Sequence, residues 1–257
     1  MRALLVGMAL ALMACPERTV PARGVQLVYR KPSSESVRSV VDRRLAQLKL
    51  RANLQEDDST LTVRVPEGGD LSRIKSVFFL AGKLEFCAED PGLAARWCDD
   101  SWPAGITTER TGTTCMLRGD TRAALEQALA DAGSEVAFAA KPAGAYVVAS
   151  CLVPRIVSAV VHEKPPSITL EFDRAGAKDF AELTRSTVGR RLIIRLEGVV
   201  ESAPVVMDAI TTGKAMLTVG EPDRAALEVL AASLVGGELP VMKLEREGTF
   251  GPPGRMR

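Results

Sequence analysis

One continuous stretch, residues 167–212, limits the possible folds of the chain more than any other part. Ile168, Leu170 and Phe172 alternate with polar neighbours, which is the period of a strand with one buried face. Asp173 then stands at an N-cap position ahead of an apolar stripe with helical spacing. The residues that follow alternate again and turn back at a Glu-Gly pair, as in a β-hairpin. A strand, a helix and a hairpin in this order predict an α+β fold.

The same order of elements is predicted in both halves of the chain. In residues 24–87, apolar periodicity predicts β-α-β-β-α-β, with Ser33 or Ser34 as one helix cap and Asp70 as the other. In residues 167–246, the stretch described above is followed by a further strand, helix and strand. We therefore predict an α+β fold with a pseudo-duplicated ferredoxin-like (βαββαβ) base made of these two halves.

Residues 88–166 separate the two halves and are predicted to form a small inserted α+β head. Residues 90–114 are rich in Gly, Pro, Asp and Thr, a composition typical of a loop. A helix over residues 121–132, capped by Asp120, is predicted to lie between short strands.

Several sequence words resemble the first periplasmic domain of SecD, the accessory membrane protein of bacterial Sec protein export. They are F-D-x-x-G-A-x-x-F-A-E-L-T at 172–184, V-G-R-R-L at 188–192, S-A-P-V-V at 202–206, I-T-x-G at 210–213, V-V-D-R-R-L at 40–45, A-G-K-L-E-F at 81–86 and G-E-L-P at 237–240. These words lie towards both ends of the chain, in family order, and leave residues 87–166 unmatched. The resemblance implies a duplicated base, and by position the insert corresponds to the head subdomain of SecD, which is associated with contacting exported polypeptide.

Both tryptophans of the chain, Trp97 and Trp102, fall in one loop of the insert. Exposed aromatic side chains would offer a tolerant apolar surface to an unfolded polypeptide, so both are candidate polypeptide-binding residues. The alternative is that they fold inward and form the core of an insert that has few other large residues.

The N-terminus resembles an export signal. Arg2 is followed by a short apolar run that ends in Leu-Met-Ala-Cys, a sequence similar to the lipobox of bacterial lipoproteins. We expect residues 1–15 to be a lipoprotein signal peptide with lipidation at Cys15, and residues 16–23 to be a tether. A plain secretory signal and a buried N-terminal helix are the alternatives. The remaining boundary falls at the tail, residues 247–257.

Four cysteines remain after Cys15 is assigned to the lipid: Cys87, Cys98, Cys115 and Cys151. In an exported protein they permit two disulfides in three connectivities. We favour Cys87–Cys151, which would join strand ends that bound the insert, and Cys98–Cys115, which would close its loop. A metal site and free thiols are the alternatives, but there is no C-x-x-C pair and the single histidine, His162, lies outside the cysteine-bearing unit.

The sequence carries no motif of a hydrolase, a metalloprotease or a nucleotide-binding loop. A catalytic role for His162 would need a nucleophile such as Ser158 or Cys151; the alternative is a polar residue at the end of a strand or linker. The paired arginines at 43–44 and 190–191 are interpreted as solvated or structural. A net charge of +1 with 4% aromatic residues argues against a nucleic-acid partner.

Together these features predict a non-enzymatic, SecD-like accessory of protein export, lipid-anchored on the periplasmic side of a membrane, that binds or guides unfolded polypeptide without a cofactor or metal. Sec translocon components are further expected partners. Because no second apolar stretch approaches membrane length, we expect the chain to lack the transmembrane helices into which SecD continues. One alternative is a scaffold lipoprotein that binds SecDF or another envelope complex without touching substrate, and another is an envelope hydrolase.

Overall fold

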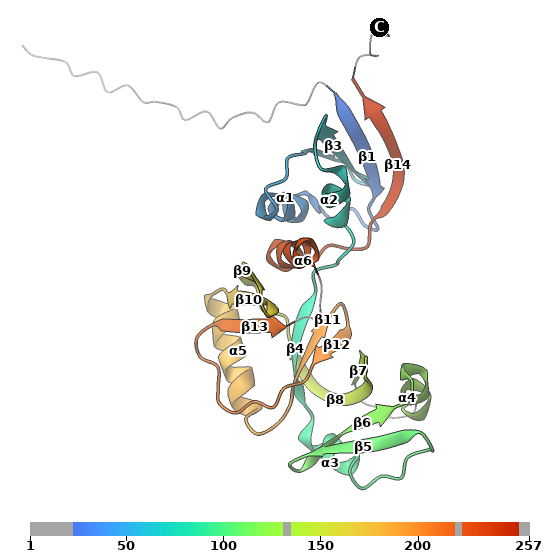
Figure 1. Ribbon diagram of the computed structural model, residues 1–257, viewed down its shortest axis with the longest axis vertical. Helices are drawn as coiled ribbons and strands as arrows, with labels where there is room; N and C mark the ends of the chain where they lie inside the picture. Colours follow the sequence, from blue (N-terminus) through green and yellow to red (C-terminus); the bar gives the residue numbers. More distant parts are fainter. Residues whose placement is uncertain (1–22, 131–134, 219–222, 252–257) are drawn as a thin grey trace, which may run out of the picture.

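The computed structural model describes residues 23–130, 135–218 and 223–251. The proposed signal peptide, Cys15 and most of the proposed tether lie outside these residues, as does the extreme C-terminus. The described chain forms two lobes stacked along the long axis of the molecule (Figure 1). No helix among the described residues is long and apolar enough to cross a membrane.

The first lobe is an antiparallel four-stranded sheet with two helices on one face. Its strands have the order β14-β1-β3-β2. The elements are β1 (Gly24–Arg30), α1 (Arg38–Gln47), β2 (Asn53–Glu56), β3 (Thr60–Pro66), α2 (Leu71–Ser76) and β14 (Lys243–Phe250). In β3, buried Leu61, Val63 and Val65 alternate with half-buried residues and face the helices, as the period-two pattern predicts.

The fourth strand of this sheet comes from the other end of the chain, and the predicted duplication is wrong on this point. Strand β4 (Leu84–Glu89), which we expected to close the first sheet, lies in the second lobe. All six residues of β4 are buried, so it needs cover on both faces and partners on both edges, which a sheet edge does not provide. Strand β14 has charged, exposed side chains and pairs with β1 over seven residues, as suits an edge.

The second lobe contains a seven-stranded sheet with the order β4-β11-β12-β7-β8-β6-β5. An additional pairing of β4 with β8 makes β4, β11, β12, β7 and β8 a closed five-stranded ring. The further elements of this sheet are β5 (Ile106–Thr111), β6 (Thr114–Gly119), β7 (Val136–Ala140), β8 (Ala143–Leu152), β11 (Leu192–Leu196) and β12 (Val199–Ser202). Because strands from the insert and from the C-terminal half share this sheet, the insert is part of one lobe and is not a separate head.

A second core of this lobe lies between the ring and a three-stranded sheet of order β13-β10-β9. These strands are β9 (Ile156–Glu163), β10 (Pro166–Phe172) and β13 (Lys214–Thr218), and they pack with helix α5 (Arg174–Ser186). Phe86, Phe172 and Phe180 meet edge to face in this core, with ring centroids 4.8–5.7 Å apart.

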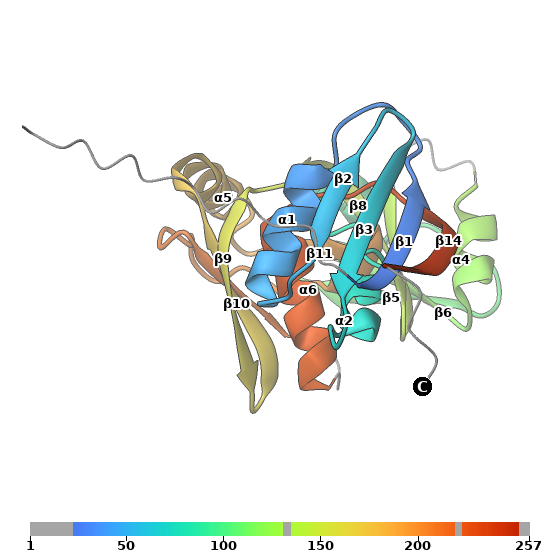
Figure 2. The same cartoon turned by 90° about the horizontal axis from the view of Figure 1, so that it is seen from above.

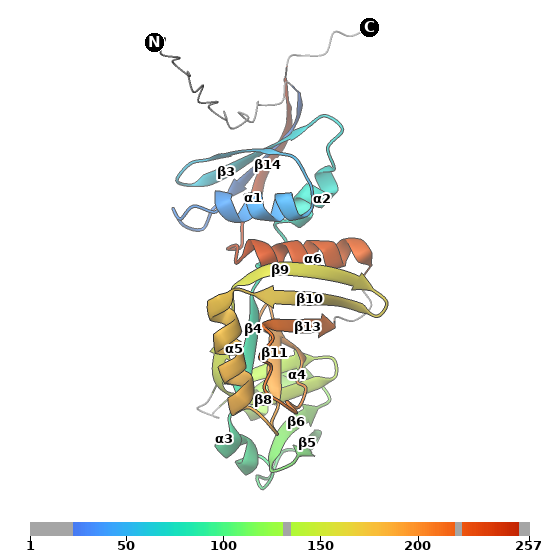
Figure 3. The ribbon, with the colours of Figure 1, turned by 90° about the vertical axis from the view of Figure 1, so that its left-hand side faces the viewer.

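Helix α6 (Arg224–Gly236) lies between the two lobes (Figure 3). One side contributes Leu227, Leu230 and Leu234 to the core of the second lobe, and Ala232 belongs to the core of the first. Helix α1 packs directly on α6, and the two overlap when the molecule is seen from above (Figure 2). A helix that is apolar on both sides in this way is buried by both partners.

The structure confirms two of the predicted helix N-caps and differs at two others. Asp70 and Asp173 cap their helices as predicted, each accepting a hydrogen bond from a backbone N–H three residues on. Helix α4 (Arg122–Ala128) is capped by the Thr121 hydroxyl rather than by Asp120. Helix α1 begins after Val37, not at Ser33 or Ser34, and no side chain of the N-cap residue caps it.

Residues 90–114, which we predicted to be loop, contain helix α3 (Pro91–Arg96) and strand β5. The signal for α3 was present in the sequence. Asp90 accepts from the N–H groups of Gly92 and Leu93, and Pro91 occupies the first helical turn, where its missing N–H costs nothing.

Candidate functional site

The chain crosses between the lobes twice, through residues 77–83 and 236–242, which together we call the neck. The two segments run in opposite directions. They are joined by a hydrogen bond of 2.8 Å from the Leu239 N–H to the Ala81 carbonyl.

Arg44 of α1 holds the two neck segments together. Its guanidinium donates to the carbonyl oxygens of Val77 and Leu80 at 2.8 and 2.6 Å, and to those of Ala81 and Gly237 at 2.6 and 2.7 Å. The side chain is fully buried, and this burial lowers the pKa of Arg44 to about 10, so it remains a cation at neutral pH. One cation thereby satisfies carbonyl groups of both crossings.

Two glycines make room for this arginine. A Cβ on Gly236 would lie 2.3 Å from Cγ of Arg44. A Cβ on Gly82 would lie 2.5 Å from the Ser233 carbonyl oxygen and 2.7 Å from Nη2 of Arg44. Arg43, the other arginine of the pair, donates to the Gly236 carbonyl. The interpretation of this arginine pair as structural agrees with these contacts.

A carboxylate of the second lobe, that of Glu197, also binds the neck. Glu197 stands at the β11–β12 turn with a positive φ of 53°. Its side chain accepts from the backbone N–H groups of Ala81, Gly82 and Lys83 at 2.7–3.1 Å. A carboxylate in a row of three N–H groups fixes the orientation of that backbone. A Glu-Gly turn predicts only a hairpin, so this contact could not be predicted from the sequence.

The neck exposes two large apolar side chains, Phe79 and Val241, which are 78% and 88% exposed. Each lies two residues from the bonded pair Ala81 and Leu239, one on each segment of the neck. Exposed apolar side chains on a backbone fixed by buried hydrogen bonds form a preorganised contact surface.

The two tryptophans do not form such a surface. Trp97 is 5% exposed and belongs to the core of the insert, while Trp102 is half-buried against it with ring centroids 5.8 Å apart. The Trp102 Nε1–H donates to the Trp97 carbonyl at 3.1 Å. The prediction of Trp97 as an exposed binding residue is wrong, because the insert has few other large side chains with which to fill its core.

Both disulfides are present in the pairing that the sequence analysis favours. Cys87–Cys151 joins directly opposite residues of β4 and β8, and Cys98–Cys115 joins the end of α3 to β6. Among the described residues no cluster of His, Cys, Asp and Glu could hold a metal ion.

His162 and Cys151, the candidates for a catalytic role, each have a structural contact in the fold. His162 is exposed near the tip of the β9–β10 hairpin and bonds the Thr169 hydroxyl at 2.9 Å. Cys151 is in a disulfide and has no free thiol.

The second arginine pair also has a structural position. Arg191 is buried and pairs with buried Glu89, with 3.3 Å between Nη1 and Oε1. Thr114 donates its hydroxyl to the same carboxylate at 2.8 Å. A buried ion pair with satisfied hydrogen bonds orders the end of the ring rather than offering a reactive group.

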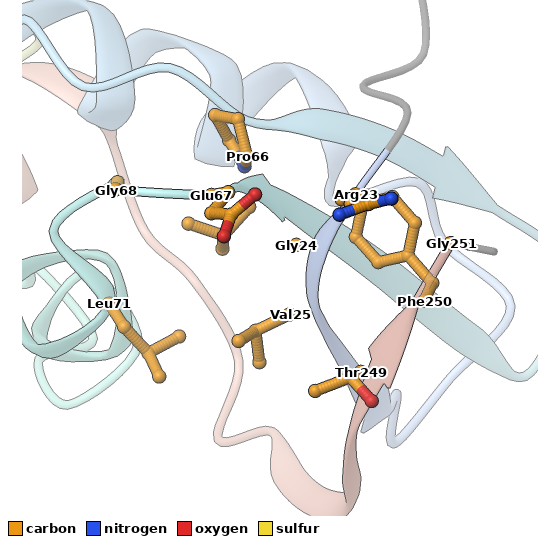
Figure 4. Close-up of a pocket in the computed structure, with 12 residues that line it drawn as sticks. Arg23, Gly24, Val25, Pro66, Glu67, Gly68, Leu71, Thr249, Phe250 and Gly251 are labelled. Atoms are coloured by element: carbon orange, nitrogen blue, oxygen red, sulfur yellow. The ribbon is translucent and has the colours of Figure 1, made fainter. Parts of the chain in front are cut away.

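A pocket of about 410 Å³ opens at the far end of the first lobe (Figure 4). The ends of β1, β3 and β14 line it, with Arg23, Glu67 and Phe250 at its rim. Gly24 lies in this wall at φ +155°, where a Cβ would strike the Val65 carbonyl oxygen at 1.9 Å. The lining of the pocket offers few groups for chemistry, because Arg23 and Glu67 are its only ionisable residues.

Comparison with known proteins gives matches to SecD and SecDF. Residues 154–241 match the family model described as SecDF, P1 head subdomain. The protein translocase subunit SecD of Acidaminococcus fermentans is 44% identical over 88 residues, which are 34% of this chain and 21% of that protein. SecDF of Thermus thermophilus is 41% identical over 88 residues, 34% of this chain and 12% of that protein.

Two solved structures share the fold. A crystal structure of SecDF in a super-membrane-facing form has a TM-score of 0.58 at 22% identity, covering 91% of this chain and 32% of that one. A structure described as a membrane component SecDF that enhances protein export has a TM-score of 0.55 at 22% identity, covering 86% and 98%.

The described residues therefore form a two-lobed α+β domain of the type found in SecDF. The matched sequence, the relatives and the shared fold together support a first periplasmic domain of the SecD and SecDF family. The chain spans about a fifth of the length of the SecD relative and less of the SecDF relative.

The range of the family model differs from our expectation for the head. We placed the head at residues 88–166, whereas the model described as the head subdomain covers residues 154–241, from β9 to the neck. Strands β4, β8 and β11, which our expectation divides between base and head, lie in one sheet.

Proposed function

We propose that the chain is a non-enzymatic accessory of protein export that holds unfolded polypeptide on the periplasmic side of a membrane. The observation that carries this proposal is the match of residues 154–241 to the SecDF P1 head family, together with SecD and SecDF relatives that are 44% and 41% identical over 88 residues. Binding alone, without a cofactor, is the mechanism we infer.

The contact surface that we propose is the neck, with Phe79 and Val241. Burying one such side chain against an apolar partner is worth about 1.5–3 kcal/mol. Arg44 and Glu197 hold the backbone that follows Phe79, and Arg44 also holds Gly237 on the segment of Val241, so little ordering cost opposes binding. Because Phe79 and Val241 are not part of a deep pocket, the surface suits many apolar segments rather than one sequence.

The test is a titration of the oxidised chain with a fluorescently labelled secretory protein, in its unfolded and its folded form, followed by anisotropy. We expect selective binding of the unfolded form, weakened about tenfold or more in Phe79→Ser/Val241→Ser. The matched control is Met216→Ser, which changes a 65% exposed residue of β13 and should leave binding unchanged.

Two outcomes contradict the proposal at different levels. Equal binding by the double variant contradicts the neck as the contact surface. A wild-type chain that binds neither form contradicts the polypeptide-holding role itself.

Lipid attachment at Cys15 belongs to the same proposal and stays a prediction. It supposes that the chain is held at a membrane by acyl chains. A Cys15→Ser variant that still sediments with membranes would contradict it.

A further inference from the structure

The two disulfides of the second lobe are nested, and this affects how they form. Cys98–Cys115 spans 17 residues and lies wholly within the loop closed by Cys87–Cys151, which spans 64. Pairing the cysteines in their order along the chain would join Cys87 to Cys98 and Cys115 to Cys151. Neither of those pairs is native, so the pairing is set by which cysteines the fold brings together rather than by their order along the chain.

The long-range disulfide lies at the seam that closes the five-stranded ring. Strand β4 pairs with β11 over five residues, but with β8 only through residues 86–89, with a register shift between Ala88 and Glu89. Cys87 and Cys151 are directly opposite each other in this short pairing. The covalent bond therefore supports the shorter of the two pairings of β4.

The two sulfur-bearing residues of this seam differ in access. Cys87 is fully buried and packs with Tyr146, Val148 and Ile193 inside the ring, whereas Cys151 is exposed near the end of β8. The other disulfide offers less, because Cys115 is 1% exposed and Cys98 is half-buried against the core of the insert. A thiolate arriving from solvent meets Cys151 before any other half-cystine.

We propose that Cys151 is a thiol–disulfide exchange site, through which a dithiol oxidoreductase of the Cys-x-x-Cys class opens and closes the β4–β8 seam. This inference does not depend on polypeptide binding at the neck.

The exchange proceeds in two steps that conserve atoms and electrons. A thiolate of the oxidoreductase attacks the Cys151 sulfur, a bond forms between the two proteins, and Cys87 leaves as a thiolate that takes up a proton. The second thiol of the oxidoreductase then attacks its own mixed disulfide and releases Cys151. The chain gains two electrons and two protons, and the oxidoreductase ends as a disulfide; the reverse sequence closes the seam.

Opening the bond has a local effect on the second lobe. Without it, the short β4–β8 pairing holds the ring closed by hydrogen bonds and the packing of Cys87 alone, while β4 stays paired with β11. We therefore expect reduction to loosen residues 84–89 and 148–152 and to leave the first lobe unchanged, because its sheet contains no cysteine.

The test uses the full oxidised chain and reduced glutathione as the probe. Samples at increasing ratios of reduced to oxidised glutathione are quenched with an alkylating agent and mapped by mass spectrometry. We expect Cys87–Cys151 to open at a ratio at least about tenfold lower than Cys98–Cys115, with the glutathione adduct on Cys151. Opening of Cys98–Cys115 first or at the same ratio, or an adduct mainly on Cys87, overturns the proposal.

A second arm measures the seam and the protein partner. Hydrogen exchange should rise at residues 84–89 and 148–152 in the selectively reduced chain and in Cys87→Ser/Cys151→Ser, but not in the matched control Cys98→Ser/Cys115→Ser. Unchanged exchange after reduction overturns the proposal even if the double variant fails to fold. Thioredoxin with its second active-site cysteine replaced should be trapped on Cys151; trapping only on Cys98 or Cys115 contradicts the site.

Discussion

Arg44 shows how much of this structure depends on one side chain. Its guanidinium takes the place of water as the hydrogen-bond donor to carbonyl groups of both neck segments. Gly82 and Gly236 have no side chains and leave the space that it occupies. The sequence shows only an Arg-Arg pair on a helix. Burial of Arg44 could not be predicted, because its carbonyl partners are distant in the sequence. Three of them are separated from it by 33 to 37 positions, and the fourth by 193.

Replacing Arg44 by Met should destabilise the protein by at least about 3 kcal/mol, because several buried carbonyl groups lose their donor at once. The measurement is denaturant unfolding followed by far-UV circular dichroism. Arg38→Met is the matched control on the same helix. Its side chain is 52% exposed in a surface pair with Asp42, so it should cost no more than about 1 kcal/mol. Equal losses in the two variants would mean that the buried contacts contribute little.

Asp57 at the β2–β3 turn predicts a pH dependence. Hydrogen bonds from the Thr60 hydroxyl and from the N–H groups of Ser59 and Thr60 lower the pKa of Asp57 to about 2, from 3.8. Because the folded pKa is lowered, the stability due to this carboxylate is present above pH 3.8 and is lost as the pH falls towards 2.

The direct measurement is the NMR titration of the Asp57 carboxyl, with the free energy of unfolding followed between pH 5 and 2. Asp57→Asn should flatten the acid limb of the stability curve, whereas Asp58→Asn on the same turn should preserve it. An Asp57 that titrates near 3.8 in the folded protein rules out this explanation.

At the scale of elements, β14 illustrates what periodicity can and cannot predict. Apolar alternation predicts that strands exist near 24–30 and 60–66, and a polar N-cap predicts the start of α5; the structure confirms these elements. Pairing is a different question. Nothing in the local sequence states that β14, rather than β4, completes the first sheet, because that choice depends on which strand is buried on both faces.

Ending the chain after Met242 removes β14 and should unfold or strongly loosen the first lobe, because β1 loses a partner along its whole length. Hydrogen exchange should accelerate in β1 and β3 and change much less in the ring of the second lobe. Ending the chain after Gly251 is the control and should preserve protection in β1. Slow exchange of β1 in the shorter chain would show that the edge pairing is dispensable.

For the site, the sequence predicts both disulfides, but it does not predict the neck. Trp97 and Trp102 are the two tryptophans of the chain, but a rare residue type does not by itself distinguish a core residue from a surface residue. Phe79 and Val241 are unremarkable in the sequence, and only the structure shows that both are exposed on the neck. The only indirect signal is that the A-G-K-L-E-F and G-E-L-P words contain Ala81 and Leu239, the two residues bonded across the neck.

At the scale of the molecule, α6 makes the two lobes one unit of stability. Its residues Leu230 and Leu234 belong to the core of the second lobe, and Ala232 to that of the first. Loss of either lobe would expose one side of this helix to water, at about 25 cal/mol per Å² of apolar surface.

The chain should therefore unfold in a single calorimetric transition, with matching calorimetric and van't Hoff enthalpies. Leu230→Ala should lower the midpoint for probes in both lobes, at a cost of about 2–5 kcal/mol. Two separated transitions, or a variant that affects the second lobe alone, would show that the lobes are independent.

The two strands at the outer end of the first lobe have a mechanical consequence. Gly24 and Phe250 are directly paired, so the described chain enters and leaves the fold at the same point. Tension applied to these two ends pulls along the line of the β1–β14 hydrogen bonds and loads them one after another, starting at the terminal pair. A small force would then separate β14 from β1 by sequential breaking of these hydrogen bonds, the unzipping geometry. The neck and the second lobe would carry almost none of the load.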